Sequence, residues 1–240
     1  MPKLSFVTGI VAACLFAGSA NAITLINEYR PNPTGGDPAT QEVELLGTPG
    51  ESFSGVISAI DTDAGGPFGL INDFNSVAGT FDVNGLAVVS IDDLENPSHV
   101  IIFSTIAPAI GTDLDVDDDG SIDDLSVFGT VFDAIGVIDT AGDSNGIAAQ
   151  LGGTEIVFTG DEPQLVFRDA LTQILFAVND PADPDFVDDE AGNEVSISDF
   201  SFDPTVATFG SANPTAVPLP AGLPLLLAGL GGLAFLRRRA

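Results

Sequence analysis

Short apolar runs, rich in Val, Ile and Phe, alternate with turns of Gly, Pro, Asp and Asn through most of the chain. Several runs alternate apolar and polar residues, which is typical of half-buried strands, and no amphipathic helical pattern appears between residues 23 and 210. The predicted strands are 23–29, 41–47, 53–61, 79–91, 99–105, 125–139, 153–160, 164–170, 173–179 and 194–202. The pattern therefore predicts an all-β body with a sandwich or barrel architecture.

Some segments predict more than a half-buried strand. The continuous apolar runs 85–91 and 99–105 suit central strands that are buried on both faces. The acidic segment 179–194 contains few apolar residues and predicts a long solvated loop, and residues 211–216 predict a short linker. The body is thus expected to span residues 23–210.

The first 22 residues have the organisation of a secretory signal peptide. Lys3 gives the positive start, residues 6–18 are mostly apolar, and the small residues Ala20 and Ala22 form a cleavage site of the A-x-A type. A first transmembrane helix is the alternative, but the apolar stretch is short for a span. Lipidation at Cys14 is a second alternative; cleavage after Ala22 fits the pattern better.

The chain ends in a second apolar segment, which is followed by three arginines. Residues 221–236 would form a helix about 24 Å long at roughly 1.5 Å per residue. The cluster Arg237, Arg238 and Arg239 predicts a cytoplasmic C-terminus and places the body outside the cell. We expect one transmembrane helix here, serving as a temporary or a permanent single-span anchor.

Composition limits how the body can be stabilised and what it can bind. Cys14 is the sole cysteine, so the mature chain has no disulfides. The body between residues 23 and 216 carries 2 basic and 35 acidic residues, a formal charge of −33. This charge excludes nucleic acid as a partner. It is typical of proteins adapted to a saline, cation-rich medium. The 45% hydrophobic content argues against disorder.

One acidic segment has the spacing of a calcium-binding loop. Asp115, Asp117 and Asp119 occupy positions 1, 3 and 5 of an EF-hand-type loop, with Gly120 at position 6 and Ile122 at position 8. Alternating Asp residues on a tight turn can direct several oxygens at one hard cation. The sequence therefore predicts a structural calcium site within residues 113–126, with a solvated acidic turn as the alternative.

The rest of this loop departs from the EF-hand pattern. The Ser121 carbonyl and Asp123 supply further candidate ligands, but position 12 is Ser126 in place of the usual Glu. Asp124, or a carboxylate from another part of the chain, must then complete the set of calcium ligands. The flanking residues lack helical character, so the loop is expected to lie between strands.

Catalytic candidates are few. His99, the sole histidine, is expected at a strand entry as a surface or strand-edge residue, with a metal ligand or general base as the alternative. Neither a nucleophile elbow nor a phosphate loop nor a zinc cluster appears in the sequence. We therefore expect no enzymatic activity, although an extracellular hydrolase that uses a carboxylate pair on polysaccharide stays open as the alternative. Glu28 and Glu44 are interpreted as residues that anchor turns or strands.

The body resembles bacterial lamin-tail domains in two short motifs. "LINEYRPNP" with "QEVELLGT" is similar to the opening of such domains, and "ATFGSANP", residues 207–214, is similar to their close. The chain lacks the Trp that usually follows the second strand in this family. The resemblance implies an immunoglobulin-like β-sandwich that is used for binding or structural display.

The C-terminal segment 217–240 resembles the VPLPA variant of the PEP-CTERM sorting signals. Its motif is Val217, Pro218, Leu219, Pro220 and Ala221, followed by the apolar span and the arginine cluster. The resemblance implies recognition by an exosortase-type membrane protease, cleavage near the motif, and transfer of the body to the cell surface or extracellular matrix. Exopolysaccharide or another surface protein would then be the partner.

Overall fold

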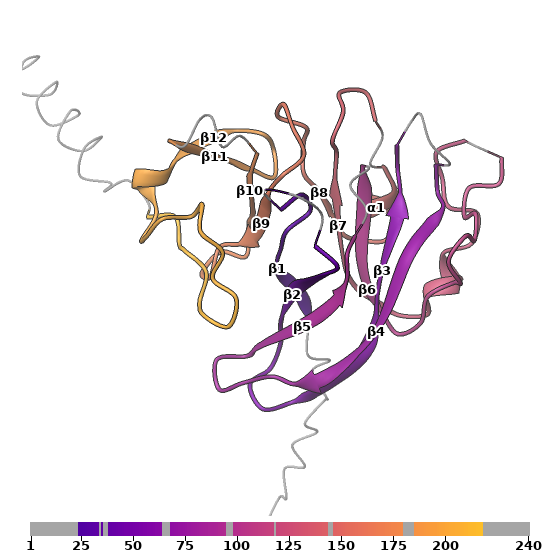
Figure 1. Cartoon of the computed structure of the whole chain (residues 1–240), viewed down its shortest axis with the longest axis horizontal. Helices are drawn as coiled ribbons and strands as arrows, with labels where there is room; N and C mark the ends of the chain where they lie inside the picture. The colour runs from indigo at the N-terminus through magenta and orange to yellow at the C-terminus, as the bar shows by residue number, and fades with distance from the viewer. Residues whose placement is uncertain are drawn as a thin grey trace, which may run out of the picture.

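Two β-sheets and very little helix make up the described part of the chain, as the computed structural model shows (Figure 1). The structure describes residues 24–217, except for residues 34, 36–37, 64–67, 95–97, 118, 144–145 and 180–184. The first sheet has seven antiparallel strands. In order across the sheet they are β12 (Glu194–Ser196), β11 (Phe186–Asp189), β10 (Leu175–Val178), β9 (Leu165–Arg168), β1 (Leu25–Tyr29), β2 (Thr40–Leu46) and β5 (Leu86–Asp92).

The second sheet has five strands, of which the last pair is parallel. They are β4 (Ile71–Thr80), β3 (Ser52–Asp61), β6 (His99–Ser104), β7 (Val131–Val137) and β8 (Thr154–Glu155). Three short helices complete the described elements, namely η1 (Leu125–Phe128), α1 (Gly146–Gln150) and η2 (Ile197–Asp199).

The main hydrophobic core lies between the two sheets. Ile26 and Leu45 come from the seven-stranded sheet, Ile57 and Phe103 come from the five-stranded sheet, and all four are at most 1% exposed. Burial of such side chains stabilises the fold by about 1.5–3 kcal/mol each. The prediction of an all-β body is confirmed, and the arrangement is consistent with a β-sandwich.

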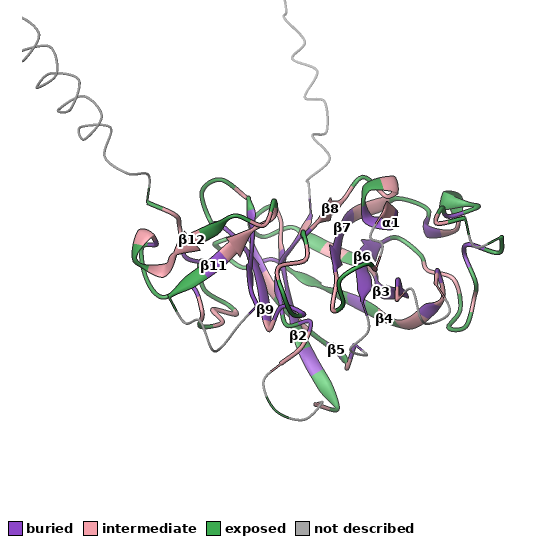
Figure 2. Ribbon diagram, turned by 90° about the horizontal axis from the view of Figure 1, so that it is seen from above, coloured by how far each residue is buried: buried purple, intermediate pink, exposed green. Residues whose placement is uncertain are grey.

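A second core covers the outer face of the five-stranded sheet. Strand β6 is buried along its whole length, because Ile101 and Phe103 face the main core while Val100 and Ile102 face outward. The outward pair packs under the loop between β6 and β7 and under α1. In Figure 2, strand β6 has the purple colour of buried residues. The prediction for residues 99–105 is therefore confirmed.

A third core lies on the outer face of strands β9 to β11. Phe167 and Phe176 stack there, and Phe200 meets both rings edge-on, with ring centroids 5.0–6.1 Å apart. Residues 197–216 pass over this face, and Ala216 packs against the cluster. Residues 211–216, expected to be a linker, therefore belong to the packed body; Asn213 within them is 3% exposed.

The structure corrects several predicted element boundaries. Strand β4 was not predicted, because only Ile71 and Val77 are buried in this polar strand at a sheet edge. The predicted strand 79–91 is interrupted by a turn in which Asp82 accepts the backbone N–H groups of Asn84 and Leu86. The predicted loop 179–194 contains β11, whose pairing with β10 and β12 overrides its acidic composition.

Two further expectations are wrong for local reasons. The run 85–91 was expected to be buried on both faces, but β5 lies at the edge of its sheet and its exposure alternates. The predicted strand 125–139 begins as the helix η1, because the Asp124 side chain caps that turn by accepting the Ser126 N–H.

Candidate metal centre

The predicted calcium loop lies between β6 and β7, outside the five-stranded sheet. Its apolar residues Leu114 and Ile122 are 5% and 7% exposed and pack into the second core. Gly69 approaches the loop so closely that a Cβ there would lie 2.9 Å from the Asp115 Cβ. The loop is therefore fixed on the sheet by its two apolar residues.

Asp115 organises the turn from a fully buried position. Its Oδ1 accepts the Asp119 N–H at 3.0 Å, and its Oδ2 accepts the Gly120 N–H at 2.8 Å. Gly120 has a φ of +84°, which non-glycine residues rarely adopt. The sequence pattern of alternating Asp residues followed by Gly thus corresponds to a real tight turn.

This turn brings three of the predicted ligands together. Asp115, Asp117 and Asp119 each offer a carboxylate oxygen, and these oxygens all lie within 4.8 Å of one another. The repulsion of Asp119, followed by smaller effects of burial and of Asp123 and Asp115, raises the pKa of the Asp117 carboxyl. A divalent cation would relieve this repulsion, because it replaces carboxylate repulsion with direct attraction.

Gln150 of α1 holds the far side of the loop, a role that no signal in the sequence indicated. Its Nε2 donates to the Gly120 carbonyl at 3.1 Å, and its Oε1 accepts the Ile122 N–H at 2.9 Å. The two bonds fix the backbone on both sides of Ser121. The Ser121 carbonyl, a predicted ligand, is thus part of a backbone that α1 supports.

The other two predicted ligands lie outside the triad. Asp123 Oδ2 accepts the Val116 N–H at 3.0 Å, and this bond joins the two ends of the loop. Asp124 Oδ1 accepts both the N–H and the hydroxyl of Ser126, which directs it to the cap of η1. In this arrangement three carboxylates and the Ser121 carbonyl could hold the metal, and water would supply the remaining ligands.

A second group of carboxylates lies on the outer face of the seven-stranded sheet. Glu28 of β1 and Glu44 of β2 are direct cross-strand partners, and both are at most 1% exposed. Glu28 Oε1 accepts the Thr208 N–H at 2.7 Å, and Glu44 Oε2 accepts the Gly210 N–H at 2.5 Å. These glutamates anchor segment 207–214 on the sheet, which agrees with the anchoring role expected from the sequence.

The Thr208 hydroxyl lies between Glu28 and Asn213. Its oxygen is 3.0 Å from Glu28 Oε2 and 2.7 Å from Asn213 Oδ1, and its single proton can be donated to one of the two at a time. Burial, opposed by the bonds from Thr208, raises the pKa of Glu28 to about 7.

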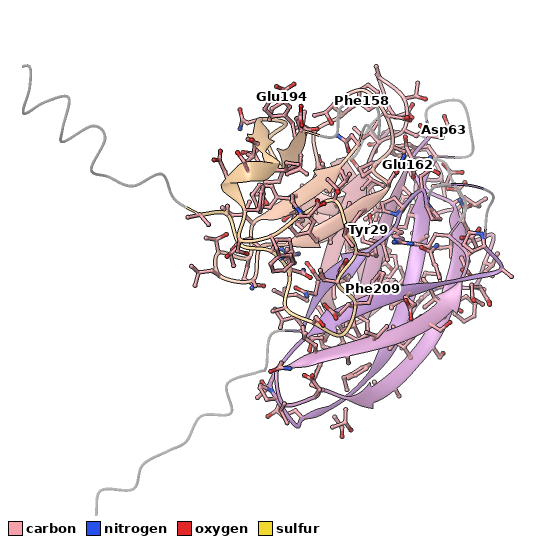
Figure 3. All side chains as sticks on the ribbon, turned by 60° about the vertical axis from the view of Figure 1, so that its left-hand side comes forward. Tyr29, Asp63, Phe158, Glu162, Glu194 and Phe209 are labelled. Carbon is pink, nitrogen blue, oxygen red and sulfur yellow. The ribbon has the colours of Figure 1, made fainter. Side chains whose placement is uncertain are left out.

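His99 lies in the interior and not on the surface as expected, because it opens the fully buried strand β6. Its Nδ1 is 3.5 Å from Glu162 Oε1, and its ring meets Tyr29 edge-on at 6.2 Å between centroids. Burial, and secondarily the charge of Asp139, raises the pKa of Glu162 to about 9. Figure 3 shows Tyr29 and Glu162 in this part of the molecule.

The predicted terminal signals lie mostly outside the described residues. This holds for the signal peptide 1–22, the span 221–236, the arginine cluster and the sorting motif after Val217. Val217 is 53% exposed, and its N–H donates to the Asp199 carbonyl at 2.6 Å. Within the part of the chain that the structure describes, no helix is long and apolar enough to cross a membrane.

Comparison with known proteins leaves the geometry as the main guide to function. No protein-family model matches the chain, and neither a curated protein nor a solved structure is significantly similar to it.

Proposed function

We propose that the chain is an exported, non-enzymatic protein of the cell surface or extracellular matrix. Its body would be an immunoglobulin-like β-sandwich of the lamin-tail type, stabilised by calcium. The observation that carries this proposal is the convergence of carboxylates in the Asp115 triad. The buried Glu28, Glu44 and Asp133 bind the chain's own groups, whereas the exposed Asp117 and Asp119 each bring a carboxylate oxygen within 4.8 Å of one another and of Asp115.

The calcium ion would stabilise a region that lacks other cross-links. The mature chain has no cysteine, and the loop between β6 and β7 is held by the contacts of Leu114, Ile122 and Gln150. A bound cation adds to these contacts and reduces local repulsion in a body of formal charge −33. Its role would be structural.

The position of Val217 supports processing at the sorting motif. Within the described residues, the packed contacts of the body reach Ala216, whose N–H donates to Asp169 Oδ2 at 2.6 Å, and the Val217 N–H, which donates to the Asp199 carbonyl. Cleavage by an exosortase-type protease near residues 217–221 would therefore release a body that keeps all of these contacts. The signal peptide and the anchor would both be absent from the mature protein.

A polysaccharide hydrolase with a carboxylate pair is the alternative, and one observation favours it. Glu28 and Glu44 face each other on adjacent strands, and burial raises the pKa of both carboxyls. However, segment 207–214 covers the pair, and Asn27, Thr208 and Gly210 occupy its oxygens. The geometry of the pair therefore fits a structural role better than a catalytic role.

Mass spectrometry of the exported protein tests the proposal. We expect a product that begins at Ile23 and lacks Arg237, Arg238 and Arg239, recovered from the surface or matrix fraction. Replacing both Pro218 and Pro220 by Ala should leave the arginines in place, whereas the control Thr215→Ala should be processed normally. A wild-type product that is surface-associated but retains the arginines would contradict processing, and retention of the body inside the cell would contradict export.

A further inference from the structure

A pocket of about 520 Å³ lies on the outer face of the seven-stranded sheet, beside segment 207–214. Strand pairing builds its floor. Tyr29, the last residue of β1, pairs with Val43, and Arg30 follows it; Glu42, beside Val43 on β2, pairs with Ser90 of β5. Arg30, Glu42 and Ser90 line the same pocket, and all three are exposed.

Phe209 forms one wall of the pocket, and the buried glutamates fix its place. The residues on either side of it, Thr208 and Gly210, donate their N–H groups to Glu28 and Glu44. The half-buried Phe209 ring is therefore held over the strands by bonds on both sides (Figure 3). Pro33 and Pro38 add apolar surface to the same pocket.

The charge of Arg30 is unusual in this protein. Among the described residues it is the one exposed basic side chain, since Arg168 is 6% exposed and bound to Asp133. Arg30 forms no ion pair with another described residue, although Glu42 lines the same pocket. A guanidinium that has no ion-pair partner among the described residues, in a body of formal charge −33, could bind one carboxylate.

The pocket also offers hydrogen-bonding groups of both kinds. Thr40 and Ser90 contribute hydroxyls, and Glu42 contributes a carboxylate. Gln41, between Thr40 and Glu42 on β2, is 7% exposed and shares the inner face of the strand with Val43 and Leu45, so its side chain is not part of this polar set.

We propose that this pocket binds a carboxylate-bearing sugar, a uronic acid residue of an acidic polysaccharide. Arg30 would bind the sugar carboxylate in bidentate geometry, and Glu42, Ser90 and Thr40 would bind its hydroxyls. The apolar face of the sugar ring would pack on Phe209. Glu42 repels a phosphate dianion, and the number of polar groups fits a polyol better than a simple carboxylate. The inference rests on the proposed matrix location, because it names the partner that the body would meet there.

Calorimetric titration of the full chain with a trigalacturonate tests this site. The titration contains chelator, so that calcium cannot bridge the sugar to the Asp115 triad, and trigalactose is the neutral probe. We expect measurable binding of trigalacturonate and at least roughly tenfold weaker binding of trigalactose, because the charged bonds to Arg30 are lost.

Two variants and a control assign the binding to the pocket. Arg30→Gln should weaken trigalacturonate binding about tenfold or more, and Phe209→Ala should weaken both probes. Val83→Asp changes the net charge by the same amount as Arg30→Gln, at an 88% exposed residue on the turn between β4 and β5, and should bind as the wild type does. All three variants are compared by thermal melting, so that loss of folding is recognised.

Several results would overturn the site. They are absence of binding by the folded wild type, equal affinity for the two probes, and equal weakening by Arg30→Gln and Val83→Asp. A negative binding result would not contradict export or processing, because these are tested by the mass of the mature product. Failure of export would leave the binding measured in vitro unchanged.

Discussion

The Arg168 guanidinium Nη2 lies 2.8 Å from Asp133 Oδ2, and this buried ion pair joins the two sheets. Arg168 belongs to β9 of the seven-stranded sheet, and Asp133 belongs to β7 of the five-stranded sheet. Ile26 of β1 bonds to both residues, through its N–H to Asp133 at 2.8 Å and through its carbonyl to Arg168 Nε at 2.9 Å. Burial raises the pKa of Asp133 even though Arg168 opposes this effect.

Removing the guanidinium should therefore destabilise the body severely. We expect Arg168→Met to lower the free energy of unfolding by about 3–5 kcal/mol, because the Asp133 charge stays buried without its partner. Arg30→Met is the matched control: Arg30 is exposed and forms no ion pair with another described residue, so the change should be within about 0.5 kcal/mol. Denaturant unfolding measures both values, and equal stability of the two variants would contradict the role of the ion pair.

Calcium should raise the melting temperature of the protein after chelator treatment. At a calcium concentration of about 100 times Kd, binding to the native state adds about 2.7 kcal/mol, or roughly 5–10 °C for a domain of this size. Asp119→Asn should reduce this shift, because it removes a charged ligand of the triad. Glu51→Gln, at an exposed residue away from the loop, should keep it. An unchanged melting temperature in the wild type would contradict the calcium site.

Stability should fall as pH rises from about 5 to 9 in the presence of chelator. Burial raises the pKa of Glu28 to about 7 and that of Glu162 to about 9, from 4.5 in both cases. The native state then holds protons that the unfolded chain has released, so each group contributes stability that is complete below pH 4.5 and is lost through its folded pKa.

A neutral variant at Glu162 separates its contribution to this pH dependence of stability from the contribution of general charge repulsion. Glu162→Gln should flatten the decline between pH 7 and 9, since its side chain does not ionise, whereas Glu51→Gln should keep the wild-type slope. Melting temperatures across this range give the measurement. Stability that increases from pH 5 to 9 would contradict the prediction. Below pH 4, protonation of Asp82, whose pKa the Leu86 N–H lowers, removes stability.

A buried amide, in addition to Glu28 and Glu44, attaches segment 207–214 to the body. Asn213 Nδ2 donates to the carbonyls of Asn27 and Arg168, at 3.2 and 2.9 Å. Asn213→Ala should cost about 1–3 kcal/mol, because two buried carbonyls lose their partner. Ser211→Ala, at an exposed residue of the same segment, should change the stability by less than about 0.5 kcal/mol. Hydrogen exchange at Thr208 and Gly210 should speed up only in the first variant.

The sequence by itself determined the β class, most strand positions and the acidic turn. Alternating apolar residues are a local signal, as in β2, and so are the alternating Asp residues before Gly120. These patterns predict local structure because the chain conformation and the burial of one face depend on neighbouring residues.

The tertiary structure decided what residues distant in the sequence do together. Strand β11 and the polar edge strand β4 depend on their partners across the sheet, so their own residues carried a weak signal. Gln150 bonds to the acidic loop that follows Asp115, Arg168 pairs with Asp133, and Glu28 and Glu44 fix the residues on either side of Phe209. Such contacts depend on how distant segments pack, and no local pattern of residues encodes that packing.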